Sequence, residues 1–595
     1  MQNFKLPSVM SHSFAEVPNV SLPRSSFDRS HGYKTTFDHG YLVPFLVDEV
    51  LPGDTFNVDV TAFARLSTPL RPFMDNIKMD THFFFVPLRL LQTNFVKMMG
   101  EQANPADTIA YAAPTMTSTA VTGYLAGSVM DYMGLPTEIP GLVHNTYPLR
   151  AYNKIWNDWY RDENLQNSVT VDVGDGPDTV SNYSTLLPRG KRHDYFTSCL
   201  PFAQKGTAVT IGLSGTADVW GTGTLAQFTP GSSSQGTPLN APWVAQWVNR
   251  VTTDGFSAGM MTGITQTVGG APVFTGTSIG QGQTIEGNTT GYTSGTGNVQ
   301  NNTNTGLVFL TQADSATART ATIGSGTPTA PFMASLGGAT GISINDLRLA
   351  IATQQLLEQS ARGGTRYTEL MKSMFGVTSS DARLQRAEYL GGGSTDVICS
   401  EIPQTSETSG SNVLGQLAAK GTALIQGNGF VRSFEEHGVL IGLVSTRADL
   451  TYQNGLNKMW SRSTRYDWYL PVFANLGEQS VLNKEIYAVG TSGGGTAQDA
   501  ATFGYQERWA EYRYKPSLVT GQFRSNHATP LDSWHLAIDF TSLPALNSTF
   551  IVETQVPVDR ITATPADPNY LFDAFIRMTC VRVMPVYSVP GLDRL

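Results

Sequence analysis

Apolar residues recur at every second position in several parts of the chain, which is the pattern of β-strands with one buried face. In residues 55–60 (TFNVDV) this alternation directly follows the turn sequence Pro52-Gly53-Asp54. Residues 81–91 (THFFFVPLRLL) are mostly apolar and predict a strand buried on both faces. Further strands are expected over residues 438–450, 480–489, 533–540 and 575–587. Early and late strands around a long middle favour an all-β-dominated fold, a β-sandwich of Greek-key or jelly-roll type.

Three segments show helical spacing. The apolar residues of segment 152–159 recur at helical intervals and predict a helix laid against the sheet. Asn345 is placed to cap a second helix, which is expected to end at Gly363-Gly364. A third, shorter helix over residues 367–374 is expected to end at Gly376.

A block without lysine separates the early strands from the late ones. Residues 206–344 hold only four acids and two arginines among many glycines, threonines and serines. Such a tract can be a disordered linker. Its tryptophans and phenylalanines are too numerous for a solvated linker, and threonine-rich β-structure with glycine turns is the favoured interpretation. We therefore expect an exposed insertion within one body that the sequence encodes in two pieces.

Composition supports a β-rich chain and narrows its chemistry. Only 15% of the 595 residues are charged, and the chain holds 58 glycines and 32 prolines. Cys199, Cys399 and Cys580 are too far apart for a disulfide framework or a metal site. Residues 1–20 lack the apolar core of a signal peptide, and no apolar run is long enough for membrane insertion. The net charge of −9 requires any contact with nucleic acid to come from a local basic face.

Catalytic motifs are weak in this sequence. The two matches to G-x-S-x-G, at residues 276–280 and 490–494, lie in glycine- and threonine-rich sequence without the strand–turn–helix context of a nucleophile elbow. The nine histidines are scattered and share no ligand spacing. We therefore expect no catalytic residue, no cofactor and no metal site.

Three segments interleave positive charge with aromatic rings: residues 24–34, 189–196 and 462–469. Such pairing can hold single-stranded nucleic acid, because cations neutralise phosphates while rings stack on bases. The candidate DNA-binding residues are Arg24, Arg29, Lys34, Arg189, Lys191, Arg192, Arg462 and Arg465. Arginine beside tyrosine or tryptophan equally builds subunit interfaces and supports loops. The candidate interface residues are Trp460, Tyr466, Trp468, Arg508, Trp509, Tyr512 and Arg513, with Arg462 and Arg465 as further anchors.

The same segments resemble the major capsid protein family of the Microviridae, the small icosahedral single-stranded DNA phages, on the gokushovirus side. The opening match is FDRSHGYKTTFDHGYLVPFLVDEVLPGDTF, residues 27–56. Similar long matches cover residues 187–206, 363–394, 446–487, 503–517 and 584–592. No family motif aligns within residues 206–344, so the identity of any receptor does not carry over.

The resemblance implies a single eight-stranded viral jelly roll with long insertions that carry a few helices. It implies about sixty copies in a T=1 icosahedral shell around a circular single-stranded DNA genome. Such a shell would total about −540 charges, which repels DNA and calls for the small basic DNA-packaging protein that the family encodes. The protein is expected in the virion, assembled in the cytoplasm of the bacterial host.

The expected organisation follows from this resemblance and from the pattern. It comprises an extended arm (1–34), a first jelly-roll part with a helical insertion (35–205), a surface insertion forming a three-fold protrusion (206–344), a helical and loop connection (345–430), and a second jelly-roll part with a tail (431–595). The insertion is expected to bind a receptor on the bacterial host surface through Trp220, Trp243, Trp247 and Tyr292. A secreted β-sandwich adhesin or glycan-binding protein is the alternative function, and an extracellular β-rich hydrolase ranks third.

Overall fold

A computed structural model describes residues 23–207, 209, 344–405, 414–493 and 495–587, together with the backbone of short strands between residues 218 and 335. The chain divides into two units. The first joins Met1–Thr207 to Leu356–Leu595, and the second is Ala208–Gln355. The bounds of the second unit lie close to those of the predicted insertion.

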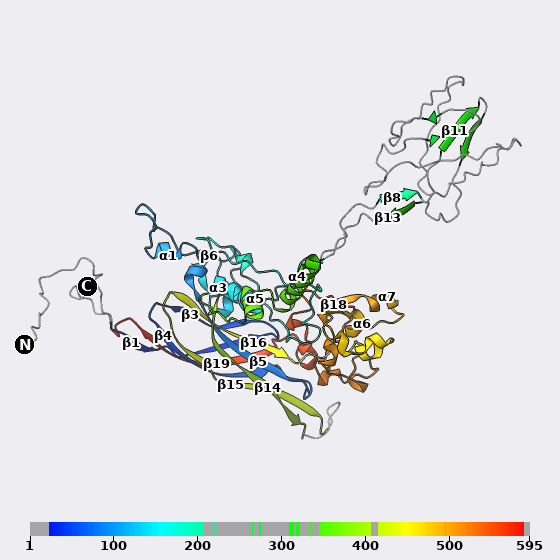
Figure 1. The fold of residues 1–595 in the computed structure, drawn as a ribbon. Coiled ribbons are helices and arrows are strands. Elements are labelled where there is room, and N and C mark those ends of the chain that lie inside the picture. Colours follow the sequence, from blue (N-terminus) through cyan, green and yellow to red (C-terminus); the bar gives the residue numbers. More distant parts are fainter. Residues whose placement is uncertain are drawn as a thin grey trace, which may run out of the picture. The chain divides into compact units, whose positions relative to one another are not determined.

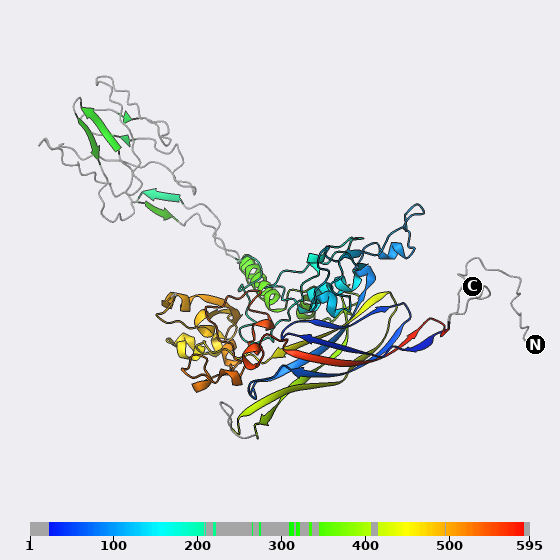
Figure 2. The ribbon, with the colours of Figure 1, turned by 180° about the vertical axis from the view of Figure 1, so that it is seen from behind.

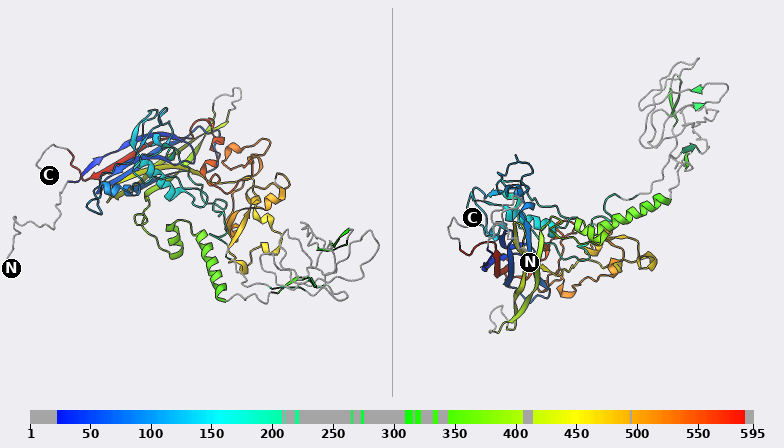
Figure 3. Two further views of the ribbon diagram at one scale, coloured as in Figure 1. Left: turned by 90° about the horizontal axis from the view of Figure 1, so that it is seen from above. Right: turned by 60° about the vertical axis from the view of Figure 1, so that its left-hand side comes forward.

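A curled antiparallel sheet forms the centre of the first unit. Its order is β1-β19-β4-β15-β14-β5-β16-β3, and β2 also pairs with β19. Figure 1 and Figure 3 show the C-terminal strand β19 among the N-terminal strands. The strands are β1 (Ser25–Asp28), β2 (His31–Phe37), β3 (Val43–Val50), β4 (Thr55–Leu66), β5 (Ile77–Pro87), β14 (Glu388–Pro403), β15 (Leu417–Ser433), β16 (Gly438–Ala448) and β19 (Tyr570–Arg582).

Two long strands change partners along their length and so divide the sheet into two halves. The first part of β14 pairs with β5, and its last six residues pair with β15 from Ile398↔Thr422 to Pro403↔Leu417. The rest of β15 pairs with β4. One half therefore holds β2, β19, β4 and β15, and the other holds β14, β5, β16 and β3. Figure 2 shows the sheet from behind.

The two halves share one apolar core. The ring of Phe45 on β3 lies 5.8 Å from that of Phe83 on β5 and 5.9 Å from that of Phe572 on β19. Phe83 also lies 5.4 Å from Phe430 on β15. Edge-to-face pairs of this kind add to the free energy of burying the rings. The halves thus pack face to face, as in a β-sandwich.

A second apolar layer covers the outer face of the half that contains β5 and β16. Helix α3 (Tyr147–Ile155), extended by a π-helical turn to Tyr160, packs there against Phe84 and Ile441. Figure 1 shows α3 on this side of the sheet. Strands β5 and β16 are consequently buried on both faces. The prediction of a doubly buried strand at residues 81–91 is confirmed, although the strand runs from Ile77 to Pro87.

The remaining elements of the first unit are short. The helices are α1 (Phe95–Met98), α2 (Val129–Tyr132), α5 (Tyr367–Phe375), α6 (Asn483–Ile486) and α7 (Gly495–Ala500), and α4 (Ile344–Arg362) ends in this unit. Two small sheets pair β6 (Thr115–Thr117) with β7 (Val143–Asn145) and β17 (Glu478–Leu482) with β18 (Thr502–Glu507). Helix α5 ends at Gly376 in the left-handed conformation, as predicted.

The second unit shows three antiparallel strand pairs. They are β8 (Asp218–Gly221) with β13 (Phe332–Ser335), β9 (Ile264–Thr265) with β10 (Val273–Phe274), and β11 (Phe309–Asp314) with β12 (Thr317–Ala321). Trp220 lies on β8 opposite Met333. The other predicted receptor residues, Trp243, Trp247 and Tyr292, lie outside the described residues.

Several predicted elements differ from the structure. Residues 25–37 form strands β1 and β2 instead of an irregular arm, and residues 388–430 are largely strand instead of a helical connection. Residues 533–540 form no strand and make only an isolated bridge at Ile538, while the strand expected over 480–489 ends at Leu482. Strand β15 was not predicted because its glycines read as turn residues. The strand needs Gly429 for close packing, since a Cβ there would collide with the carbonyl oxygen of Val58 on β4.

The three cysteines are free, with Cys199 and Cys580 buried. Within the described ranges, no helix combines the length and the apolar character needed to cross a membrane.

Phe45→Ala should lower the free energy of unfolding by about 3–5 kcal/mol, because the cavity would lie between the two halves of the sheet. Denaturant unfolding of the unassembled chain measures this change. Phe375→Ala is the matched control, since that ring is 73% exposed and its loss should cost about 0.5 kcal/mol or less. Equal losses in the two variants would contradict the shared core.

Candidate interaction surfaces

The basic segment 189–196 crosses the first unit as an ordered chain. Arg189 N donates to Gly40 O at 2.8 Å, and Lys191 N donates to Ile551 O at 2.8 Å. Both side chains are buried. The segment is thereby attached to the turn between β2 and β3 and to the loop before β19. The side chains of Arg189 and Lys191 therefore point into the chain and not to solvent.

Arg189 belongs to a buried charge cluster around Asp80 on β5. The carboxylate of Asp80 lies 2.9 Å from Arg189 Nη1 and 3.0 Å from Arg447 Nη2. Burial alone would raise the pKa of Asp80. The charge of Arg189, a hydrogen bond with Ser394 and the charge of Arg447 together outweigh burial and hold that pKa below its usual value. Burial, followed by the charge of Arg189, lowers the pKa of His82 to about 4, so that ring is neutral near pH 7 and contacts Tyr160 Oη at 2.8 Å.

Lys191 occupies an apolar position beside a buried acid. Its Nζ lies 4.6 Å from the centre of the Phe550 ring and makes no hydrogen bond with any described residue. Burial lowers the pKa of Lys191 to about 8, and the nearby Glu553 opposes the shift only in part. The Glu553 carboxylate is itself fully buried, with Oε1 2.6 Å from Ala448 N and 3.2 Å from His39 Nε2.

Of the predicted DNA-binding residues in this segment, Arg192 is the one that is partly exposed. Its side chain is 32% exposed and lies 3.3 Å from Asp449. Near the N-terminus, Arg24 is exposed and donates to Thr55 Oγ1 at 3.0 Å, while Arg29 pairs with Asp48 at 2.5 Å. Lys34 on β2 is exposed and makes no ion pair with a residue that the structure describes.

A second surface, which we call the arginine–aromatic ridge, consists of residues 458–476 and 507–513. Trp509 forms its buried base, and Trp509 Nε1 donates to Phe473 O at 2.9 Å. Tyr469 packs edge-to-face on Trp509, with ring centres 5.6 Å apart. The ridge is thereby ordered within a single chain.

Arg462 reinforces this base from the other side. Its guanidinium group lies 3.2 Å from Glu511 and 4.2 Å from the centre of the Tyr512 ring. Glu511 also accepts a hydrogen bond from Gln479 Nε2 at 2.7 Å. The Arg462 side chain is almost fully buried by these contacts, which makes it a support of the ridge and not a free cation.

The predicted interface residues thus fall into two groups. Trp460, Tyr466, Trp468 and Tyr512 are exposed, as are the cations Arg465 and Arg513. Trp509 is buried, and Arg508 lies over its ring at 4.6 Å. Sequence reasoning missed Leu470, Val472 and Leu476, which are exposed on the ridge. The signal was present, because the apolar run YLPVF at 469–473 shows neither the strand nor the helix period.

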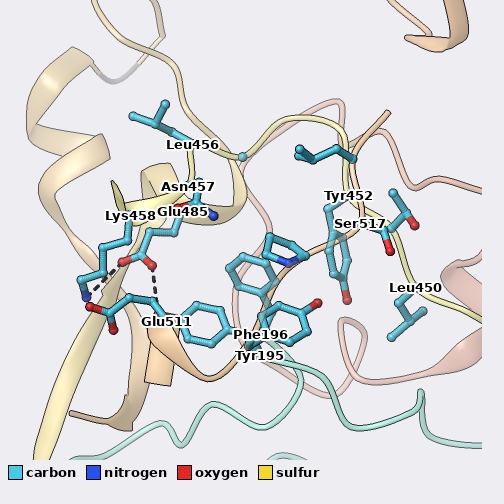
Figure 4. A pocket seen from close by; sticks show the side chains of 15 residues that line it. Tyr195, Phe196, Leu450, Tyr452, Leu456, Asn457, Lys458, Glu485, Glu511 and Ser517 are labelled. Atoms are coloured by element: carbon cyan, nitrogen blue, oxygen red, sulfur yellow. Dashed lines mark hydrogen bonds and ion pairs between the residues drawn. The ribbon is translucent and has the colours of Figure 1, made fainter. Parts of the chain in front are cut away.

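Two cavities lie among the described residues of the first unit. One cavity of about 50 Å³ lies beside Tyr195 and Tyr452, and Figure 4 shows Glu485 there, held by Lys458 at 3.5 Å and by Tyr195 Oη at 3.0 Å. That volume holds one or two waters. A wider cavity of about 340 Å³ is lined by Arg161, Glu163 and Arg366, which pair with one another. No cluster of metal-ligating side chains occurs among the residues described.

Nearly the whole chain is similar in sequence to known capsid proteins. Residues 15–592 match the family model described as "Capsid protein (F protein)". The chain is 43% identical to the capsid protein VP1 of Chlamydia phage 1, over 99% of both chains. It is 42% identical to the capsid protein VP1 of Bdellovibrio phage phiMH2K, over 98% of this chain and 97% of the relative. It is 34% identical to that of Spiroplasma virus 4, over 98% of each.

Lys191→Met should change how stability depends on pH. In the folded chain the pKa of Lys191 is about 8, against an ordinary value of 10.5. Between about pH 8 and pH 10.5 the unfolded chain therefore binds more protons than the folded chain does. For this reason the wild type gains stability as the pH rises through this range. From about pH 7 to about pH 9.5 the wild type should gain about 2 kcal/mol relative to the variant in denaturant unfolding.

Lys97→Met is the control, because Lys97 is exposed on α1 and should give the same pH dependence as the wild type. A constant difference between the wild type and Lys191→Met across this range would show that Lys191 is not desolvated.

Proposed function

The chain belongs to the capsid protein (F protein) family, and on this premise we propose that about sixty copies of it assemble into a T=1 icosahedral shell around a circular single-stranded DNA genome. It is a structural major capsid protein of the phage virion, and its relatives are capsid proteins and not enzymes. The observation that carries the proposal is the match over nearly the whole chain to capsid proteins of three phages.

The wall of this shell is a single eight-stranded jelly roll in our proposal. In that fold, strands are shared between two four-stranded sheets that face each other. The pairing order supports this assignment, because β2, β19, β4 and β15 form one half of the curled sheet and β14, β5, β16 and β3 form the other. Strands of the sheet that follow one another along the chain belong alternately to the two halves, from β2 to β5 and again from β15 to β19. The short strand β1 continues the edge that β2 occupies on β19.

The arginine–aromatic ridge is the proposed contact between copies. Large exposed aromatic and apolar side chains on an ordered base are typical of interface anchors. Trp460 is 72% exposed and Val472 is 89% exposed, which is costly for a chain that remains a monomer. Arg465 and Arg513 provide charges at the rim of the same surface.

Genome packaging and host attachment complete the proposal. Arg24, Arg29, Lys34, Arg192 and Arg465 are retained as candidate DNA contacts, since Arg189, Lys191 and Arg462 are buried within the chain. A small basic DNA-packaging protein offsets the charge of a shell built from chains of −9. The insertion 206–344 forms the three-fold protrusion and binds the receptor on the bacterial host, in whose cytoplasm the shell assembles.

Val472→Asp should abolish shell assembly while the chain remains folded. A charge at this exposed position leaves the core intact but cannot be buried between copies without a large desolvation cost. Electron microscopy and sedimentation of the purified variant measure assembly, and circular dichroism measures folding. Val121→Asp is the control, because Val121 is 86% exposed and lies outside the ridge. Normal shells from Val472→Asp would remove the ridge from the interface.

A further inference from the structure

Among the residues that the structure describes in the first unit, no layer covers one face of the sheet. On β4 and β19 every second residue is buried in the core, and the residues between them are mostly exposed. The opposite half of the sheet differs, because its outer face is covered by α3 and its neighbours. The outer face of β2, β19, β4 and β15, which we call the open sheet face, is therefore a broad ordered surface available to a partner.

Two aromatic rings stand on the open sheet face. Phe63 on β4 is 38% exposed, and Phe575 on β19 is 51% exposed. The register places Phe63 opposite Asp573 and Phe575 opposite Thr61, so the two rings are diagonal neighbours on adjacent strands. Diagonal neighbours lie about 7–8 Å apart. Rings at this separation on a sheet surface can stack on two successive bases of an extended single strand.

Cations surround these rings. The exposed residues Lys34 on β2, Arg65 on β4, Lys420 on β15 and Arg577 on β19 lie on this face, against the acids Asp59 and Asp573. Four cations and two acids leave the face with a charge of +2 on a chain of −9. Arg65 lies 5.1 Å above the Phe63 ring. Arg577 approaches Asp59 only to 3.9 Å, and Lys34, Arg65 and Lys420 make no ion pair with a described residue.

We propose that the open sheet face binds single-stranded DNA, with bases stacked on Phe63 and Phe575 and phosphates neutralised by Lys34, Arg65, Lys420 and Arg577. This site rests on the proposed function, because it requires a packaged genome. It assigns genome contact to the sheet itself, beyond the basic segments 24–34, 189–196 and 462–469.

Charge favours DNA over a second copy of the chain as the occupant. The centres of protein interfaces are depleted in charged residues, whereas this face sets four cations among its exposed apolar side chains. Those apolar side chains are the rings Phe63 and Phe575 and the leucines Leu424 and Leu571. A copy of the same chain carries a net charge of −9 but offers no row of phosphates. Single-stranded DNA offers both partners that the face lacks, a line of negative charge and aromatic bases.

Ultraviolet cross-linking of purified full particles tests this site directly. Mass spectrometry of the cross-linked peptides should find nucleotide adducts within β4 (Thr55–Leu66) and β19 (Tyr570–Arg582). Empty shells serve as the control and should give no adducts. Adducts confined to other segments would overturn the open sheet face as the DNA site and leave the shell function intact.

The double variant Arg65→Gln, Lys420→Gln provides the second test. Shell yield should stay at the wild-type level, while nuclease-protected DNA per shell falls by about half or more. The matched variant Lys97→Gln, Arg383→Gln removes two exposed charges elsewhere and should package normally. Unchanged packaging in the first variant would overturn the site. Loss of shells from a folded double variant would show that the face contacts another copy, and it would also overturn the DNA site. Wild-type particles that contain no DNA would instead contradict the proposed function itself.

Discussion

The shared core between the two halves of the sheet is the constraint on which the rest of the structure depends. Phe45, Phe83 and Phe572 come from three strands far apart in the sequence and must meet for the halves to close. Once they close, the half with β5 and β16 receives a second layer from α3 and is buried on both faces. The described part of the chain leaves the outer face of the other half open. A stable wall with one covered side and one open side follows from this asymmetry.

Buried charge attaches the loops to that wall. Asp80 on β5 holds Arg189 and Arg447, and Glu553 lies near Lys191 and His39. Taking such ions out of water is costly unless each finds a partner, so these clusters add little net stability and instead specify one placement of the loops. For this reason the start of the basic segment 189–196, which was predicted to bind DNA, lies in the interior of the chain. The aromatic residues left exposed, on the ridge and on the open sheet face, are then the surfaces that the fold offers to partners.

Local sequence patterns were sufficient to predict some elements of the fold. The alternation in residues 55–60 predicted β4, and the helical spacing at 152–159 predicted the end of α3 and its π-helical turn. Strands rich in glycine were missed, because Gly391, Gly392 and Gly429 read as turns in the sequence while the sheet needs them for close backbone approach. The burial of Lys191 could not be predicted either, since its surroundings at Phe550 and Glu553 lie more than 350 residues away. Family resemblance supplied the function that no local motif could supply.

An icosahedral reconstruction of purified particles by electron microscopy would show which surfaces lie between copies and which face the genome. We expect a closed shell of about sixty chains, with the arginine–aromatic ridge buried between neighbouring copies and the open sheet face turned inward against DNA density. A shell in which the ridge faces solvent and a neighbouring copy covers the sheet face would contradict this expectation.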